Sequence, residues 1–192
     1  MEWTFLARNE QETERLGAAL ARLLPGGTVV AMTGTLGAGK TRLVRAVAEA
    51  SGVPRETVAS PTFVLVREYK GSRPIFHFDT YRIKDEDEFL ELGPEEYFYS
   101  EGLSFVEWAE RMAPLLPNDR LDLLVSIQDD GSRLFQLKTK GNFPVDVLQK
   151  IESELNKKGP SCPGCAHCGW LLAFLAFFFF RSGSDLCRGW LS

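Results

Sequence analysis

The sequence predicts an α/β domain in which a central mixed sheet is flanked by helices. A β-branched and apolar run at residues 28–33 (TVVAMT) has the pattern of a buried strand. A glycine-rich loop follows at once, and a helical pattern then extends to about Ser51. Further short apolar runs alternate with helical patterns, which is typical of a layered sheet domain. With 192 residues the chain is long enough for one well-packed core.

Turn residues and caps divide the rest of the chain into short elements. Asn9 can cap the first helix, and Pro25 with the two glycines after it ends that helix. Gly93-Pro94 ends a short acidic helix, and Asp129-Asp130-Gly131 can form the turn of a hairpin. The other expected strands are 63–69, 75–78, 104–108, 121–128 and 133–139. The other expected helices are 9–24, 85–92 and 144–157.

Composition and charge exclude several classes of protein. The formal net charge of −4 gives no overall attraction for bare nucleic acid, so contact with RNA would need a local basic patch or a partner protein. Residues 1–15 carry charges where a secretory signal needs an apolar segment. All four cysteines lie beyond residue 160, so residues 1–158 cannot form a disulfide scaffold. We therefore expect a cytoplasmic protein with no membrane partner.

The composition changes abruptly at residues 159–192. We expect the folded domain to be 1–158 and the Cys- and Phe-rich tail to lie outside it. Cys162, Cys165 and Cys168 have the spacing of a zinc knuckle, which is one alternative for the tail. A membrane-surface or hydrophobic docking segment at 170–180 is another, because this apolar run is too short to span a bilayer. The favoured hypothesis is a read-through or frameshifted end without a selected function.

The glycine-rich loop carries the clearest chemistry in the sequence. Residues 34–41 (GTLGAGKT) match the pattern G-x-x-x-x-G-K-[ST] at every fixed position, between a strand and a helix as that pattern requires. The glycines let the backbone amides wrap around phosphate oxygens, and the following helix adds the positive end of its dipole. Lys40 can reach the β- and γ-phosphates, and the Thr41 hydroxyl can ligate Mg²⁺. The motif predicts a P-loop NTPase-like fold that binds ATP and Mg²⁺.

Two later strands end in carboxylates. Residues 74–78 lead into Asp79, and residues 103–106 lead into Glu107. An apolar strand that ends in a carboxylate can deliver an acid to a nucleotide-bound magnesium ion, and the sequence leaves open which of the two is the direct ligand. His77 lies two residues before Asp79 and so on the same face of the strand. It can order the carboxylate or sense the γ-phosphate; the alternative is a structural histidine of the core.

Several segments in this order resemble the TsaE-like proteins, the ATPase subunits of bacterial tRNA threonylcarbamoyladenosine biosynthesis. The resemblance covers about residues 9–108. The segments that carry it, besides GTLGAGKT, are Ser60-Pro61-Thr62-Phe63, His77-Phe78-Asp79-Thr80-Tyr81-Arg82, Leu92-Gly93-Pro94-Glu95-Glu96-Tyr97-Phe98 and Val106-Glu107-Trp108. One position departs from the family pattern, because Thr35 stands where an Asp is usual, which can alter coupling to partners.

The resemblance implies roles for individual residues. It implies that Thr41 and Glu107 ligate magnesium and that Asp79 acts near the metal or the attacking water. It also implies that residues 60–62 form a switch-like loop and that Trp108 lies at the nucleotide or partner surface. The predicted catalytic residues are Lys40, Asp79 and Glu107, and the predicted metal ligands are Thr41, Asp79 and Glu107. The predicted nucleotide-binding residues are Gly34, Leu36, Gly37, Ala38, Gly39, Lys40, Thr41, Arg42, Thr62 and Trp108, with a solvated helix face as the alternative for Arg42.

The resemblance further implies that the chain works with TsaB and TsaD. In that system ATP hydrolysis sustains the partners' transfer of a threonylcarbamoyl group to adenosine 37 of tRNA, so tRNA is contacted through the complex. Three alternatives remain at this stage. A small-molecule kinase uses the same loop but needs an arginine-rich lid, and a GTP-dependent switch needs an Asn-Lys-x-Asp motif; neither is present in the sequence. A non-catalytic nucleotide-binding scaffold is the third.

Overall fold

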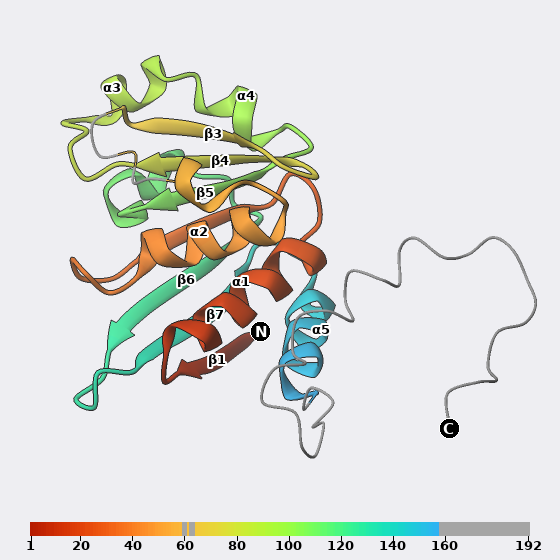
Figure 1. Cartoon of the computed structure of the whole chain (residues 1–192). Helices are drawn as coiled ribbons and strands as arrows, with labels where there is room; N and C mark the ends of the chain where they lie inside the picture. The colour runs from red at the N-terminus through yellow and green to blue at the C-terminus, as the bar shows by residue number, and fades with distance from the viewer. Residues whose placement is uncertain (59–60, 62–63, 158–192) are drawn as a thin grey trace, which may run out of the picture. The chain divides into compact units, whose positions relative to one another are not determined.

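The computed structural model of the chain describes residues 1–58, 61 and 64–157. These residues form one seven-stranded sheet in the order β1-β7-β6-β2-β5-β4-β3 (Figure 1). The strands β2, β4, β5 and β6 are parallel neighbours, while β1, β3 and β7 pair antiparallel, so the predicted mixed sheet is confirmed. The strands are β1 (Glu2–Ala7), β2 (Val29–Thr33), β3 (Val66–Lys70), β4 (Pro74–Asp79), β5 (Leu103–Glu107), β6 (Arg120–Ile127) and β7 (Arg133–Lys140).

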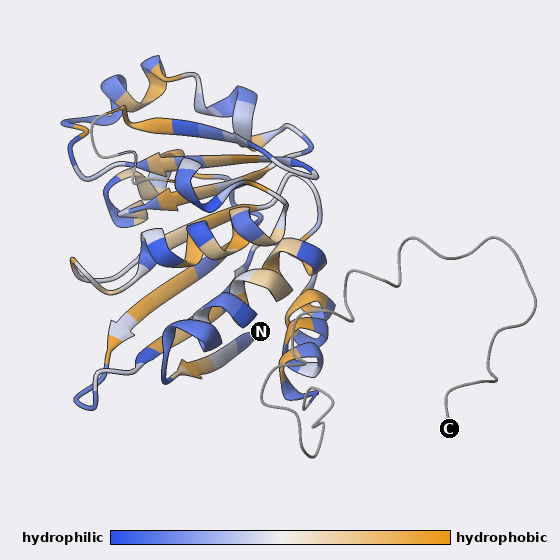
Figure 2. Ribbon diagram, in the orientation of Figure 1, coloured by the Kyte–Doolittle hydropathy of each residue, from blue (hydrophilic) through white to orange (hydrophobic). Residues whose placement is uncertain are grey.

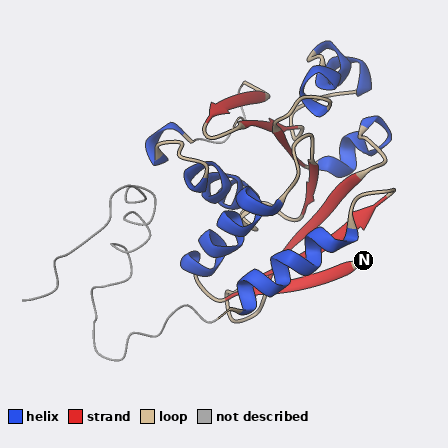
Figure 3. Ribbon diagram, turned by 90° about the vertical axis from the view of Figure 1, so that its right-hand side faces the viewer, coloured by secondary structure: helices blue, strands red, loops and turns tan. Residues whose placement is uncertain are grey.

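Helices cover both faces of the sheet (Figure 3). On one face, α1 (Glu10–Leu23), α2 (Lys40–Ala50) and α5 (Val145–Asn156) pack over the larger hydrophobic core. On the other, α3 (Glu86–Glu91), α4 (Pro94–Phe98) and the 3₁₀ helix η2 (Ala109–Leu115) pack over a smaller, aromatic-rich core. A further short 3₁₀ helix, η1 (Arg55–Thr57), follows α2. The central strands are largely hydrophobic along their length (Figure 2), and their residues belong to both cores, because both faces are covered.

Alternation along the strands decides which face each side chain meets. In β2, Val30 belongs to the core under α1 and α2, whereas Val29 belongs to the core under α3 and α4. In β5, Phe105 likewise lies on the α2 face and Val106 on the opposite face. A polar residue two positions after a core residue on the α2 face therefore points toward the same face at the end of its strand.

The helices α1 and α2 approach each other closely. Asn9 caps α1 as predicted, because its side chain accepts a hydrogen bond from Glu12 N at 2.9 Å. Further along, Gly17 faces Ala46, and a Cβ added at Gly17 would lie 2.5 Å from the Cβ of Ala46. The absence of a side chain at this position thus sets how near the first helix comes to the helix after the glycine-rich loop.

The fold departs from the predicted elements at several places, the unpredicted 3₁₀ helices η1 and η2 among them. The strand β1 was not predicted; it pairs along β7, more than 120 residues away in the sequence, at the edge of the sheet. The helix α4 was not predicted either, although Pro94 at its first turn is a usual helix start. The strand predicted from residue 63 begins at Val66, because Leu65 has a positive φ of 63° that interrupts the extended backbone. Residues 158–192, with the predicted tail, lie outside the described residues.

Candidate phosphate and metal site

The glycine-rich loop joins the carboxyl end of β2 to α2, as the sequence predicts. Gly34, Gly37 and Gly39 have positive φ values of 133°, 76° and 110°, which side chains disfavour. A Cβ added at Gly34 would lie 2.2 Å from the carbonyl oxygen of Val125 in β6, whereas one added at Gly37 or Gly39 meets nothing within 4 Å. The loop is therefore packed against the sheet at its start and open at its middle, where a phosphate group has room.

Lys40 is held within this loop. The residue is 4% exposed, and Nζ donates hydrogen bonds to the carbonyl oxygens of Gly34 at 2.6 Å and Thr35 at 3.1 Å. Burial lowers the pKa of the Lys40 ammonium below its ordinary value of 10.5, while the negative charges of Glu107, Glu110 and Asp79 oppose that shift. The ammonium thus lies where phosphate oxygens would replace carbonyl oxygens as its hydrogen-bond acceptors.

The two predicted carboxylates lie side by side at the ends of neighbouring parallel strands. Asp79 of β4 is paired in register with Glu107 of β5, and the two residues are 5% and 4% exposed. Both continue the α2 face of their strands, so they point toward the first turn of α2. There the Thr41 hydroxyl donates a hydrogen bond to Glu107 Oε1 at 2.7 Å. The structure therefore brings Lys40, Thr41, Asp79 and Glu107 together, as predicted.

His77 also reaches this cluster, but not at the predicted partner. It lies on the same face as Asp79, yet its Nε2 is 2.7 Å from Oε1 of Glu107, on the next strand. The imidazole is fully buried, with Tyr69 as a ring neighbour at 6.3 Å between centroids. His77 is therefore placed to order a carboxylate, and that carboxylate is Glu107.

Thr80 is a structural member of the site that the sequence analysis missed. Its buried hydroxyl lies 3.0 Å from the carbonyl oxygen of Glu107 and 2.9 Å from that of Trp108, and it donates to this pair. Its backbone N–H donates to the carbonyl of Glu107 at 3.2 Å. Asp79 Oδ1 meanwhile accepts a hydrogen bond from Tyr81 N at 3.0 Å. The exits of β4 and β5 are thereby fastened to each other directly beside the two carboxylates.

A pocket of about 280 Å³ opens over these groups. Its lining residues are Leu36, Gly37, Ala38, Gly39, Lys40, Thr41, Asp79, Tyr81, Arg82, Glu107 and Trp108. Nine of the predicted site residues are in this set. Gly34 does not line this pocket, Arg42 lines a second pocket, and Thr62 is outside the described residues. The position of Thr62 in the site therefore remains a sequence prediction.

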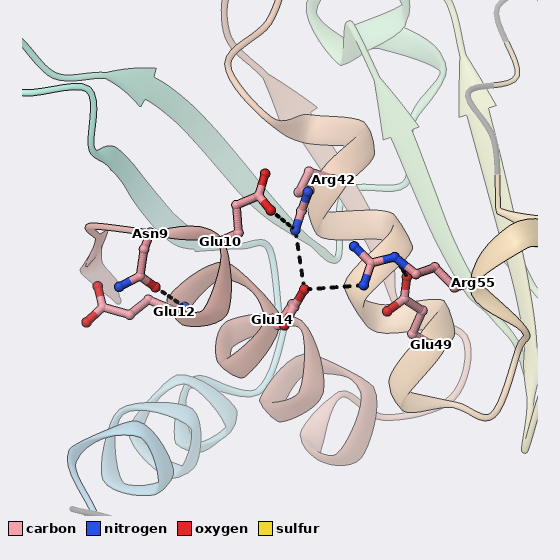
Figure 4. Close-up of polar contacts among 7 residues, drawn as sticks. All are labelled: Asn9, Glu10, Glu12, Glu14, Arg42, Glu49 and Arg55. Atoms are coloured by element: carbon pink, nitrogen blue, oxygen red, sulfur yellow. Dashed lines mark hydrogen bonds and ion pairs between the residues drawn. The ribbon is translucent and has the colours of Figure 1, made fainter. Parts of the chain in front are cut away.

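Arg42 lies in an ion-pair network between α1 and α2, not on a solvated face (Figure 4). Its guanidinium is 2.5 Å from Glu10 and 3.3 Å from Glu14, and its side chain is 24% exposed. The same residue lines a second pocket of about 360 Å³, which shares Gly37 and Gly39 with the first pocket. Its other lining residues are Ala7, Arg8, Asn9, Glu10, Thr13, Gly37, Gly39, Gly131 and Arg133.

The oxygen donors of the first pocket suit a hard divalent cation. A threonine hydroxyl and two carboxylates are the ligand types that Mg²⁺ prefers, and Mg²⁺ usually takes only one or two carboxylates together with substrate phosphates. In the part of the chain that the structure describes, no group of three or more His, Cys, Asp or Glu side chains encloses a metal position by itself.

None of the helices in residues 1–58, 61 and 64–157 has the length and apolar character that a membrane-spanning helix needs.

Comparison with known proteins identifies the family. A family model described as "Threonylcarbamoyl adenosine biosynthesis protein TsaE" matches residues 7–135, which is more than half of the chain. The chain belongs to the TsaE family. This confirms the resemblance drawn from the motifs and extends it from about residue 108 to the start of β7.

Individual relatives cover most of the same region. The tRNA threonylcarbamoyladenosine biosynthesis protein TsaE of Treponema pallidum is 37% identical over 128 residues, covering 67% of this chain and 94% of the relative. The TsaE protein of Bacillus subtilis is 38% identical over 135 residues, covering 70% and 84%. The crystal structure of Bacillus subtilis YdiB matches with a TM-score of 0.68 and 27% identity, covering 81% of this chain and 97% of that one. The P-loop-type α/β fold is therefore confirmed for this member of the TsaE family.

Proposed function

We propose that this TsaE-family chain binds ATP with Mg²⁺, hydrolyses it, and thereby supports threonylcarbamoyl transfer to adenosine 37 of tRNA. The observation that carries the proposal is the convergence of Lys40, Thr41, Asp79 and Glu107 on one pocket at the glycine-rich loop. Family membership supports the biological setting, because the relatives are named for tRNA threonylcarbamoyladenosine biosynthesis.

The loop and Lys40 would bind the phosphates of the nucleotide. The open space at Gly37 and Gly39 leaves room for phosphate oxygens to approach the backbone amides at the start of α2. Lys40 Nζ would exchange the carbonyl oxygens of Gly34 and Thr35 for phosphate oxygens, which carry more negative charge. The buried position of Lys40 strengthens that interaction, because the surrounding dielectric is low.

Thr41, Glu107 and Asp79 would hold the metal and the attacking water. Thr41 Oγ1 and the Glu107 carboxylate already lie 2.7 Å apart and would share a magnesium ion between them. Bound Mg²⁺ neutralises charge on the phosphate oxygens during phosphoryl transfer. Asp79, paired in register with Glu107 and fixed at Oδ1 by Tyr81 N, would accept a hydrogen bond from a water molecule and orient it.

The second pocket gives space for the ribose and base. It shares Gly37 and Gly39 with the first pocket, so a nucleotide bound at the loop can extend into it. Arg42 would line this extension, with its guanidinium kept in place by Glu10 and Glu14. Arg42 would therefore still belong to the nucleotide-binding residues, and it would contact the ribose or base and not the terminal phosphate.

We assign the partners as TsaB-like and TsaD-like proteins, with tRNA reached through that complex. The mouth of the first pocket carries large apolar side chains that are unusually exposed, Leu36 at 82% and Tyr81 at 50%. Exposed apolar side chains at a pocket rim are typical of a surface that a partner protein covers. The net charge of −4 supports indirect contact with tRNA through partners.

The proposal is tested by magnesium-dependent ATP hydrolysis of the full chain, alone and with purified TsaB and TsaD. We expect slow hydrolysis by the chain alone and a rise when both partners are present, with both rates lost in Lys40→Ala. Lys150→Ala is the matched control, since Lys150 lies on the outer face of α5 and pairs only with Asp146 among the described residues. If the rate of ATP consumption were unchanged by the partners but rose with a small hydroxyl acceptor, the chain would instead be a small-molecule kinase.

A further inference from the structure

His77 occupies an interior strand although it is a polar residue. It lies in the middle of β4, between β3 and β5, and its side chain is fully buried. Buried polar side chains are costly unless they are hydrogen-bonded. The hydrogen bond that the structure gives this imidazole runs from Nε2 to Oε1 of Glu107, at 2.7 Å.

One oxygen of Glu107 receives hydrogen bonds from two different elements of the fold. Oε1 is 2.7 Å from the Thr41 hydroxyl on α2 and 2.7 Å from His77 Nε2 on β4. A carboxylate offers only acceptors, so both of these groups must donate. A proton therefore lies on Nε2 of His77, and the Glu107 carboxylate is held between two elements that are themselves packed in the core.

The other ring nitrogen supports the same tautomer. Nδ1 of His77 is buried and has no hydrogen-bond partner among the described residues. A proton on Nδ1 would be a buried donor without an acceptor, and orphaned buried N–H groups are rarer in proteins than under-satisfied acceptors. A proton on Nε2 fits both the contact with Glu107 and the unpartnered Nδ1.

We propose that His77 is a positioning residue that fixes the Glu107 carboxylate in the orientation needed for a nucleotide-bound divalent cation. The inference rests on the proposed function, since it assumes that Glu107 is a metal ligand. Groups that orient a metal ligand without touching the metal typically change metal affinity 10- to 100-fold when they are removed. Thr41 is itself a proposed ligand, whereas His77 contacts Glu107 without being one.

The test uses two substitutions that separate the ring from its hydrogen bond. His77→Phe keeps a planar ring and removes the donor, whereas His77→Gln removes the ring and keeps an N–H donor at similar reach. The affinity of the full chain for a fluorescent ADP analogue is measured in saturating Mg²⁺ and again in EDTA. The ratio of the two dissociation constants reports the coupling between metal and nucleotide.

Magnesium is expected to raise the affinity for the ADP analogue, and we call this increase the magnesium-dependent gain. We expect His77→Phe to reduce the gain about 10- to 100-fold, while its affinity for the analogue in EDTA stays within about twofold of that of the unmodified chain. His77→Gln should keep the gain to within about threefold. A gain unchanged in His77→Phe, or lost equally in both variants, overturns the positioning role. Glu107→Ala separates the two hypotheses. If this variant keeps the magnesium-dependent gain, Glu107 is not a metal ligand and the proposed function fails at that point. If Glu107→Ala loses the gain and His77→Phe does not, only the role of His77 fails.

A measurement on the unmodified ring covers the case in which a variant does not fold. The chain contains two histidines, His77 and His167, and ¹⁵N spectra of the imidazoles can be assigned with the variant His167→Gln. We expect His77 to show a protonated Nε2 and an unprotonated Nδ1. A proton found on Nδ1 with Nε2 bare is incompatible with donation to Glu107 and overturns the inference.

Discussion

The indole of Trp108 lies over the ammonium of Lys40, with Nζ 3.9 Å from the ring centroid. A cation at this distance from a tryptophan face is stabilised by about 0.5–2 kcal/mol. Trp108 reaches this position because its backbone is left-handed, with a φ of 59°, directly after β5. The Thr80 hydroxyl, which donates to the carbonyls of Glu107 and Trp108, holds the turn.

The left-handed backbone at Trp108 predicts that glycine is better tolerated there than alanine. Trp108→Gly and Trp108→Ala both remove the indole from Lys40, but only the alanine retains a Cβ at positive φ. We expect the glycine variant to be more stable by about 0.5–1 kcal/mol in the free energy of unfolding, after its larger unfolded-state entropy is allowed for. Urea denaturation measures the difference. A more stable alanine variant would show that the turn relaxes out of the left-handed region.

Removing the Lys40 charge should weaken nucleotide binding far more than it changes the fold. Lys40→Met keeps much of the apolar stem and loses the charged donor, so ATP affinity should fall about 10- to 100-fold, as expected for a lost charge-assisted hydrogen bond. Titration calorimetry with ATP and Mg²⁺ measures this. Lys150→Met, on the exposed face of α5, is the control and should bind ATP as the unmodified chain does.

Two glycines of the same loop should respond differently to alanine. Gly34→Ala places a Cβ 2.2 Å from the Val125 carbonyl oxygen, so we expect a loss of about 2–4 kcal/mol in the free energy of unfolding. Gly37→Ala places its Cβ in open space and should cost only the backbone strain of about 1–2 kcal/mol. It should nevertheless abolish ATP binding, because that space is the proposed phosphate position. Paired unfolding and binding curves separate the two effects, and ATP binding by Gly37→Ala would count against the phosphate position.

The hairpin turn between β6 and β7 predicts a pH-dependent contribution to stability. The side-chain and backbone hydrogen bonds from Ser132 lower the pKa of Asp130 below its ordinary value. A carboxyl with a depressed pKa in the folded state contributes stability above its unfolded pKa of about 3.9, and that contribution is lost as the pH falls through the lower folded value. Asp130→Asn should therefore lower the melting temperature at neutral pH, with a difference that narrows below about pH 4. A constant difference across that range would exclude the carboxylate as its origin.

The convergence of the site could be predicted because it follows from strand ends and a fixed loop pattern. Lys40 and Thr41 have positions set by the phosphate loop, and strands that carry Asp79 and Glu107 at their carboxyl ends bring both to one edge of the sheet. The mixed α/β class followed from the same alternation of strand and helix patterns. These features depend on local sequence and on the general geometry of parallel strands.

Other features depend on contacts that a single sequence does not specify. His77 could be placed on the face of Asp79, but its contact with Glu107 requires knowing that β4 lies beside β5. The left-handed Trp108 depends on hydrogen bonds from Thr80, a residue on another strand exit. The strand β1 has its stability from pairing with β7 at the far end of the domain, so six residues alone gave too little pattern to predict it.

The crowded crossing of α1 and α2 has a consequence for how this chain can diverge. Replacing a helical glycine with alanine is a common route to higher thermal stability, yet at Gly17 the new methyl group would collide with Ala46. Backbone atoms of α2 lie almost as close to the added Cβ, Ala46 C at 2.9 Å and Val47 N at 3.0 Å, so a smaller residue at 46 would not make room, and bulk at 17 requires the two helices to move apart. A library randomised at both sites would therefore be expected to retain glycine at 17, and the crossing would constrain which mutational paths remain open to the helix that follows the phosphate loop.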